Sequence, residues 1–91
     1  MIADGPWRVV TAGTAARDLE RLPEKVATAI LDLYPAIADN PYRLGKPLHL
    51  ELEGYRTARR GPYRVVYRLD EEERIVTIRA VGHRSDVYRP R

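Results

Sequence analysis

Hydrophobic residues between positions 12 and 40 recur at intervals of three and four, which is the spacing of helices. A first helix would carry its apolar residues at positions 15, 19 and 22, and Thr11 or Thr14 would cap its start. On this helix Arg17, Asp18 and Arg21 are expected to face water.

The second helix is predicted to run from Pro23 to Asp39. Apolar residues recur there at positions 26, 30, 33 and 37, and Pro23 suits the first turn of a helix. Pro35 removes one backbone donor inside this segment, but the apolar period continues beyond it. We therefore expect a kink at Pro35 rather than an end. The segment from position 40 to 54 contains Asn-Pro and Gly-Lys-Pro and is predicted to be a loop, held to the domain by alternating leucines at 48, 50 and 52.

The pattern changes to strict alternation on either side of the helices. Trp7–Thr11 is a short run of aromatic and β-branched residues, typical of a strand. Tyr55–Arg60 and Tyr63–Leu69 flank a Gly-Pro turn and predict a hairpin, and Arg74–Val81 predicts a further strand. The order is β-α-α-β-β-β. We expect a single α+β domain spanning residues 1–91, with a small antiparallel sheet and two N-terminal helices packed on one face.

Charge is distributed unevenly along the chain. Residues 1–54 carry six basic and eight acidic side chains, whereas residues 55–91 carry ten arginines and five acids. Four of those acids crowd into one turn, Asp70–Glu73, so the rest of the C-terminal segment is strongly cationic. In the second hairpin strand Arg64 and Arg68 alternate with an apolar stripe and can reach a ligand. Clustered arginine is the electrostatic footprint expected of a nucleic-acid contact.

Composition excludes several other classes of protein. The chain has no cysteine and two histidines, His49 and His83, so a disulfide framework or a dedicated zinc site is not expected. No apolar run approaches the ~20 residues of a membrane span, and the first residues do not resemble a signal peptide. We expect a cytoplasmic protein with no membrane contact and no cofactor.

Two C-terminal motifs carry a family resemblance. They are Gly-Pro-Tyr-Arg-Val-Val-Tyr at positions 61–67 and Val-Gly-His-Arg-Ser-Asp-Val-Tyr at positions 81–88. Together with Arg-Asp-Leu-x-x-Leu-Pro at 17–23 and the Asn-Pro…Gly-Lys-Pro-Leu segment at 40–48, they resemble the RelE/ParE superfamily of toxin–antitoxin toxins, and the closing motif is similar to the RelE branch. The resemblance covers nearly the whole chain, from Trp7 to Arg89.

The resemblance implies the toxin of a type II toxin–antitoxin system. Such a toxin enters the ribosome and cuts mRNA in the A site without a metal ion, by attack of a 2′-hydroxyl on the adjacent phosphate. It also implies two kinds of partner, the ribosome with its mRNA and a RelB-like antitoxin that blocks the toxin.

The resemblance also assigns roles to individual residues. Arg64 and Arg84 match the arginines that hold the scissile phosphate, and Tyr88 matches the near-terminal tyrosine proposed to act as base or to stack on a base. His83 stands where some members carry lysine, and histidine is the residue type that titrates near neutral pH. The catalytic set is therefore Arg64, Arg84, Tyr88 and His83. The predicted RNA-binding set is Arg56, Arg59, Arg60, Arg68, Lys46 and Arg89.

The chain departs from the best-known family pattern in its first hairpin strand, which carries arginines where that pattern has lysines. Arginine binds phosphate but is a very poor proton donor or acceptor near neutral pH. A proton-transfer role would have to move to His83 or Tyr88, or be lost. Three alternatives stay open: a ParE-type poison of DNA gyrase on the same fold, a member that binds antitoxin or RNA without cutting, and a generic basic RNA-binding domain.

Overall fold

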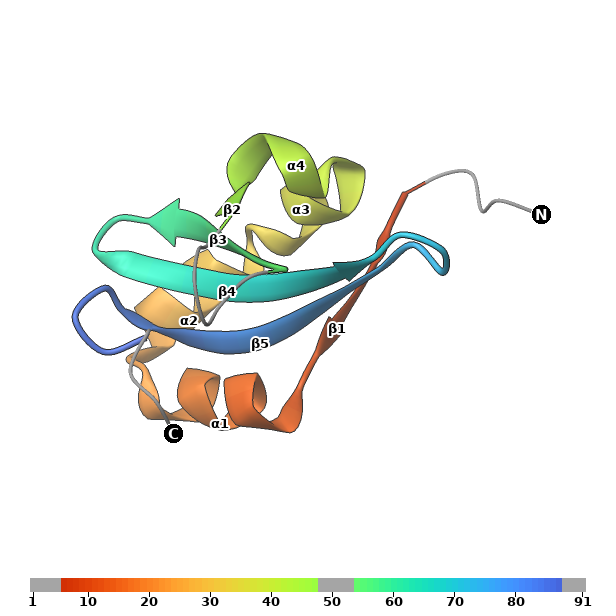
Figure 1. The fold of residues 1–91 in the computed structure, drawn as a ribbon. Helices are drawn as coiled ribbons and strands as arrows, with labels where there is room; N and C mark the ends of the chain where they lie inside the picture. Colours follow the sequence, from red (N-terminus) through yellow and green to blue (C-terminus); the bar gives the residue numbers. More distant parts are fainter. Residues whose placement is uncertain (1–5, 48–53, 88–91) are drawn as a thin grey trace.

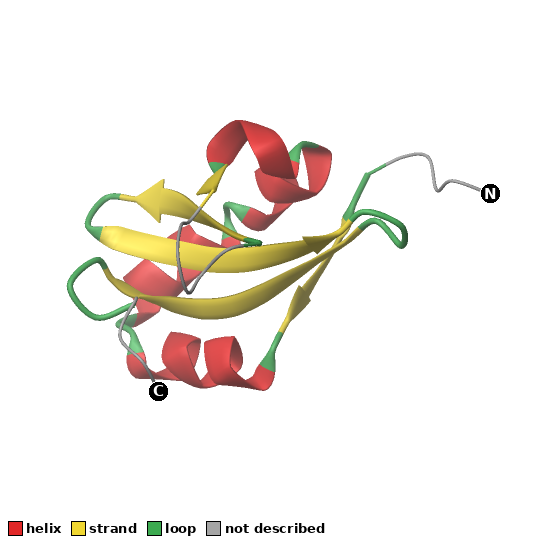
Figure 2. Ribbon diagram, in the orientation of Figure 1, coloured by secondary structure: helices red, strands yellow, loops and turns green. Residues whose placement is uncertain are grey.

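The computed structural model describes residues 6–47 and 54–87, which form a five-stranded sheet with helices on one side (Figures 1 and 2). The strand order is β1-β5-β4-β3-β2, with β1 parallel to β5 and all other pairs antiparallel. No helix in these residues is long and apolar enough to cross a membrane. The strands are β1 (Arg8–Thr11), β2 (Lys46–Pro47), β3 (Tyr55–Arg60), β4 (Tyr63–Asp70) and β5 (Ile75–His83). The helices are α1 (Gly13–Arg21), α2 (Glu24–Leu31), α3 (Tyr34–Asp39) and α4 (Pro41–Leu44).

This architecture confirms the α+β class, the hairpin and the helices on a single face. Side chains from the first three helices, Ala15, Ile30 and Ile37, pack in one cluster against the sheet. The apolar stripe of β4 belongs to the same cluster, as its alternation predicted. Gly61 has a φ of 59°, a value that glycine adopts without strain at the tight β3–β4 turn.

The expectation of one kinked helix from Pro23 to Asp39 is wrong, because the segment divides into α2 and α3. A proline ring clashes with the carbonyl of the residue four positions earlier in a continuous helix. For Pro35 that residue is Leu31, which is where α2 ends. Pro35 lies instead in the first turn of α3, where a missing N–H costs nothing.

The segment predicted to be a loop after position 40 is partly regular. The Asn40 side chain accepts a hydrogen bond from the Tyr42 N–H (3.0 Å) and caps the short helix α4. Lys46 and Pro47 then pair with Thr57 and Arg56 as an edge strand of the sheet. The leucines at 48, 50 and 52 lie outside the described residues, so their predicted role stays a prediction.

Neither threonine caps α1, contrary to the sequence-based expectation. Ala12 is the N-cap residue of this helix, and it makes no side-chain cap hydrogen bond. The Thr11 hydroxyl pairs with the Tyr34 hydroxyl (2.8 Å), and the Thr14 hydroxyl donates to the Arg79 carbonyl (2.6 Å). The Thr11 side chain therefore joins β1 to α3, and the Thr14 side chain joins α1 to β5.

Strand β5 contains one extra residue. Val66 of β4 lies opposite Ala80, but the next residue, Tyr67, lies opposite Ile78, so Arg79 has no partner in the register. Because side chains alternate with a period of two, one extra residue exchanges the faces of the strand. Ile78 packs on the helix side before the bulge and Val81 does so after it, while Ala80 packs on the opposite face with Val66 and Val87.

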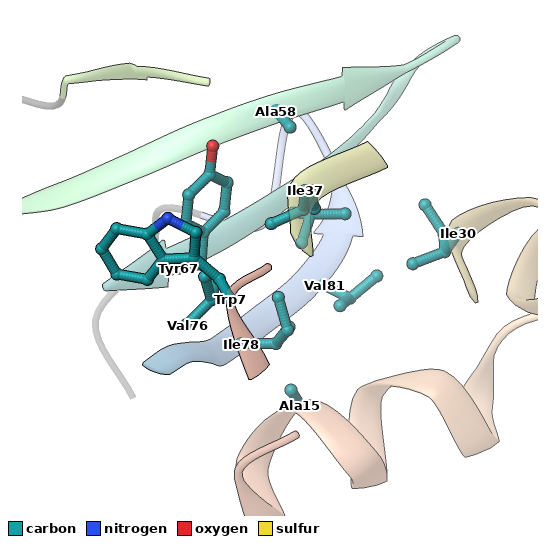
Figure 3. Close-up of a cluster of buried hydrophobic side chains, with 10 residues drawn as sticks. Trp7, Ala15, Ile30, Ile37, Ala58, Tyr67, Val76, Ile78 and Val81 are labelled. Carbon is teal, nitrogen blue, oxygen red and sulfur yellow. The ribbon is translucent and has the colours of Figure 1, made fainter. Parts of the chain in front are cut away.

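Tyr67 is the largest fully buried side chain of the core (Figure 3). Its hydroxyl donates to the carbonyl of Pro41 (2.6 Å), which fastens α4 to the sheet. Burial raises the pKa of the Tyr67 phenol above its usual value, so the group stays protonated and able to donate. Gly45 passes directly over this ring, because a Cβ built on it would overlap the hydroxyl and lie 2.7 Å from Cζ.

We expect Gly45→Ala to destabilise the fold by about 1–3 kcal/mol, the usual cost of overpacking a core. Tyr67→Phe should cost about 1–2 kcal/mol, because it leaves the buried Pro41 carbonyl without its donor. The double variant should lose less than the sum of the two, since removing the hydroxyl relieves the overlap with the new methyl group. Urea unfolding of the four chains measures this coupling, and strict additivity would contradict the close approach.

Candidate nucleic-acid interface

Two segments far apart in the sequence meet at one end of the sheet. The Arg84 N–H donates to the carbonyl of Pro62 (2.9 Å), which joins the end of β5 to the β3–β4 turn. Tyr63 lies opposite His83, and Arg64 lies opposite Gly82, in the last pairs of the β4–β5 ladder. Residues 60–64 and 82–84 are thus neighbours in space through backbone hydrogen bonds, independent of any side chain.

Two of the arginines at this end share the face of the sheet that the helices leave open. Arg64 is directly opposite Arg59 on β3, so both side chains project from the same face. The Arg64 Nη1 donates to the carbonyls of Gly61 (3.1 Å) and Tyr63 (3.0 Å), which fixes the half-buried guanidinium at the turn. Arg84 is exposed in the turn that follows β5. The backbone therefore places Arg59, Arg64 and Arg84 at the same end of the sheet, a set of residues that we call the arginine cluster.

His83 projects to the helix side of the same strand end. Its ring meets the Tyr63 ring edge-to-face, with centroids 5.8 Å apart and planes at 79°. The Ser85 N–H donates to His83 Nδ1 (3.2 Å), and the Ser85 hydroxyl lies 2.9 Å from the same nitrogen. Because Nδ1 accepts a hydrogen bond, the neutral ring carries its proton on Nε2.

The turn after β5 is closed by its own backbone. The N–H groups of Asp86 (2.8 Å) and Val87 (3.0 Å) both donate to the carbonyl of His83. Val87 is buried against Val66 and Ala80 on the open face of the sheet. Two predicted site residues, Tyr88 and Arg89, lie outside the described residues, so their roles stay predictions.

Arg56 lies away from the arginine cluster, on the helix side of β3. Its Nη2 donates to the carbonyls of Gly45 (2.7 Å) and Tyr42 (3.2 Å), and its guanidinium lies 5.2 Å from the centre of the Tyr42 ring. These contacts hold α4 against the sheet, so Arg56 has a structural role in the fold.

The remaining predicted RNA contacts are exposed but dispersed. Arg68 is on the same face as Arg64, four residues along β4 and so roughly 13 Å away, beside the Tyr55 ring. Arg60 lies opposite Tyr63 at the hairpin end. Lys46 belongs to the edge strand β2.

Sequence reasoning missed the contribution of α1. Asp18 was expected to face water, but it is 6% exposed and its Oδ2 accepts a hydrogen bond from the Val81 N–H (2.9 Å). Its spacing from Ala15 and Leu22 places it beside the apolar stripe of the helix, which was the available signal. Arg17 and Arg21 line an open groove of about 750 Å³ between α1 and the end of β5.

Comparison with known proteins shows the family to which this chain belongs. The model of the family described as the ParE toxin of the type II toxin–antitoxin system, parDE, matches residues 9–88. The toxin RelE of Mycobacterium tuberculosis is 49% identical over 90 residues, which is 98% of this chain and 93% of that protein. The chain belongs to the RelE/ParE superfamily of type II toxin–antitoxin toxins. A second toxin of that organism, RelG, is 44% identical over 92% of this chain and 98% of its own length.

Solved structures agree with this assignment to the RelE family. The toxin–antitoxin complex RelBE2 from M. tuberculosis contains a chain that matches with a TM-score of 0.83 and 42% identity, covering 88% of this toxin and 100% of that chain. A mutant of the E. coli toxin RelE in the free state matches with a TM-score of 0.75 at 15% identity, covering 90% and 88%. The second similarity supports the shared fold alone.

The arginine cluster of this RelE-family toxin is suited to binding phosphate. Guanidinium groups stay charged and pair with phosphate oxygens through two parallel N–H bonds. His83, which directly precedes Arg84 in the chain, carries an imidazole that can donate or accept a hydrogen bond. In the described part of the chain, no three His, Asp or Glu side chains come together as metal ligands.

The contacts of His83 predict its tautomer in the free toxin. The neutral ring should carry its proton on Nε2, because the Ser85 N–H donates to Nδ1. Long-range ¹H–¹⁵N correlation spectra of the imidazole at alkaline pH measure this directly. Ser85→Ala keeps the backbone donor and should preserve the tautomer, whereas a Nδ1–H form in the unaltered chain would contradict the geometry.

Proposed function

We propose that this toxin is a ribosome-dependent mRNA endonuclease that cleaves the A-site codon without a metal ion. The observation that supports the proposal is the arginine cluster, in which Arg59, Arg64 and Arg84 lie at the same end of the sheet. Hydrogen bonds to the carbonyls of Gly61 and Tyr63 already hold the Arg64 side chain in place, so it loses less conformational entropy when it binds a phosphate.

The proposed reaction is a transesterification of RNA. The 2′-hydroxyl loses its proton and attacks the adjacent phosphorus, the bond from phosphorus to the 5′-oxygen breaks, and a proton is delivered to that oxygen. The products are a 2′,3′-cyclic phosphate and a 5′-hydroxyl. Arg64 and Arg84 would stabilise the extra negative charge of the crowded phosphorane, which is the largest contribution a site of this kind can make.

Proton transfer is assigned to His83 and Tyr88. Arginine cannot serve, because it stays protonated near neutral pH. His83 Nε2 is the ring nitrogen that Ser85 does not bind, and it can exchange a proton with the RNA. Tyr88, five residues later, would act as a second proton carrier or stack on a base.

The proposal includes the partners and the compartment. A RelB-like antitoxin would block the toxin, and an acidic antitoxin would complement the excess of arginine in residues 55–91. Ribosomes carrying mRNA are the target, which requires a cytoplasmic protein.

A second candidate is a ParE-type poison of DNA gyrase. It is favoured by one observation, that the matching family model is described as the ParE toxin. A third candidate is a weak RelE-fold binder, because the first hairpin strand carries Arg56, Arg59 and Arg60 and no lysine. Gyrase-linked breaks in DNA would identify the poison, and ribosome binding without cleavage would identify the binder.

Arg64→Ala and Arg84→Ala should each lower cleavage of programmed ribosomes by about 10²–10³-fold, the usual effect of removing one donor that stabilises a developing anion. Tyr88→Phe should lower it as well if the phenol transfers a proton. Primer extension on the bound mRNA measures the A-site cuts. Arg8→Ala is the matched control, because Arg8 is an exposed arginine of β1, outside the arginine cluster, and should cut like the unaltered chain.

One outcome would contradict the nuclease proposal, and another would contradict the site assigned to it. If the unaltered chain makes no cuts in the A site, the nuclease proposal fails. If it cuts and both arginine variants cut equally well, the reaction occurs elsewhere on the surface.

A further inference from the structure

The groove between α1 and the end of β5 shares His83 with the chemistry described above, but its other lining residues have no role there. Its volume of about 750 Å³ is in the range of about 300–1,000 Å³ that small-molecule sites occupy. Arg17 and Arg21 line it from the helix, and Tyr63 and His83 line it from the strands. It is open, so a group that is part of a longer chain can enter it.

The two arginines stand on the same side of α1. They are four residues apart, which brings their Cβ atoms to roughly 6 Å in a helix. Both side chains are exposed, so a ligand in solution can reach them. Two guanidinium groups at this spacing can hold one phosphate from two sides.

Two carboxylates also line the groove, and they differ in what they can do. Asp18 is buried and bonded to the backbone of β5. Asp86 is exposed in the turn after β5 and already takes part in an interaction within the chain. The ligand contacts are therefore assigned to the two arginines and to the aromatic pair that line the groove, which suit an anion joined to a flat ring. A nucleotide has this combination in its phosphate and its base.

The aromatic pair supplies a surface for the base. Tyr63 and His83 contact each other edge-to-face, and both residues line the groove. Bases of single-stranded RNA are commonly bound by stacking on tyrosine and histidine side chains.

The groove is continuous with the arginine cluster through adjacent residues. Tyr63 and His83 are paired across the ladder, and each directly precedes an arginine of the cluster, Arg64 or Arg84. Alternation turns Tyr63 and Arg64 to opposite faces of the sheet, so an RNA strand that bends round this end would meet both sites.

We infer that the α1–β5 groove binds the nucleotide that flanks the scissile phosphate, with Arg17 and Arg21 on its phosphate and the Tyr63–His83 pair against its base. This inference rests on the proposed nuclease function. It assigns to α1 a share in substrate positioning, in addition to its packing role.

The test compares two double variants of the full chain that remove the same charge. Arg17→Gln with Arg21→Gln alters the groove, and Arg8→Gln with Lys25→Gln alters exposed cations elsewhere. Glutamine resembles arginine and lysine in helix propensity, and thermal unfolding checks that both variants fold like the unaltered chain. The probe is a fluorescent hexaribonucleotide in which every 2′-hydroxyl is methylated, so that no linkage can be cleaved by attack of a 2′-oxygen.

We expect the groove variant to bind this probe at least about tenfold more weakly, with a shallower salt dependence. Loss of one phosphate contact to single-stranded RNA lowers the slope of log affinity against log salt by about 0.7. The control variant should stay within about twofold of the unaltered chain in affinity. In NMR spectra of the unaltered chain, nucleoside 3′-monophosphates should shift the signals of Tyr63, His83 and the last turns of α1.

Cleavage of programmed ribosomes, measured in parallel, separates this inference from the proposed function. If the unaltered chain cuts mRNA but the two double variants bind the probe alike, the groove inference is overturned and the nuclease stands. If the unaltered chain does not cut yet the nucleotide shifts and the affinity loss are seen, the groove binds nucleotides and only its link to a scissile bond falls. Weakened binding of an acidic antitoxin peptide, with probe binding unchanged, would overturn the inference in favour of a protein contact.

Discussion

The single extra residue in β5 determines which side chains lie on each face of the sheet at the end that carries the arginine cluster. With Arg79 bulged out of the ladder, Val81 and His83 point toward the helices, and Ala80 and Gly82 point toward the open face. In a regular strand the two sets would exchange, because side chains alternate with a period of two. His83 would then project beside Arg64, and the small residues that let Val87 pack on the open face would be turned inward. The separation of the arginine cluster from the groove follows from this one irregularity.

Helix α1 completes the edge of β5 that β1 leaves uncovered. The parallel pairing with β1 reaches only Ile78, and Ala12 adds one more hydrogen bond to the Ile78 carbonyl. Beyond that point side chains of α1 replace a strand, because Thr14 donates to the Arg79 carbonyl and Asp18 accepts from the Val81 N–H. Buried backbone groups need partners, so this substitution allows the strand to continue to His83 without a neighbour on that side. It also fixes α1 close enough to form one wall of the groove.

Arginine serves two different purposes in the hairpin of this RelE-family toxin. Arg59 and Arg64 pair across the ladder on the open face, where their charge is available to a phosphate. Arg56, one alternation out of phase with Arg59, turns to the helix side and binds the carbonyls of Tyr42 and Gly45. Strand parity alone assigns these opposite roles. A guanidinium with five donors suits both, since it can satisfy two carbonyls of a loop as readily as two oxygens of a phosphate.

Local patterning by itself determined the hairpin, the three long strands, the first helix and the face from which Arg64 projects. Those features depend on periodicity and on turn residues, which act over a few positions. The residues that carry the family resemblance were equally visible, and the match over residues 9–88 confirms the superfamily. The roles of the proposed catalytic residues, including Tyr88, rest on that resemblance and stay predictions.

Tertiary contacts decided the rest. Pro35 is compatible with a kink or with the start of a new helix. In the structure α2 ends at Leu31, whose carbonyl would clash with the proline ring in a continuous helix. Aspartate is usually exposed, but Asp18 is buried because its carboxylate accepts a hydrogen bond from the Val81 N–H, which β1 does not reach. The bulge at Arg79 leaves no trace in the local pattern, because isoleucine, valine and alanine fill both faces of β5. The groove requires α1 and the strand end to lie side by side, and it joins residues more than 40 positions apart in the chain, which only the tertiary structure brings together.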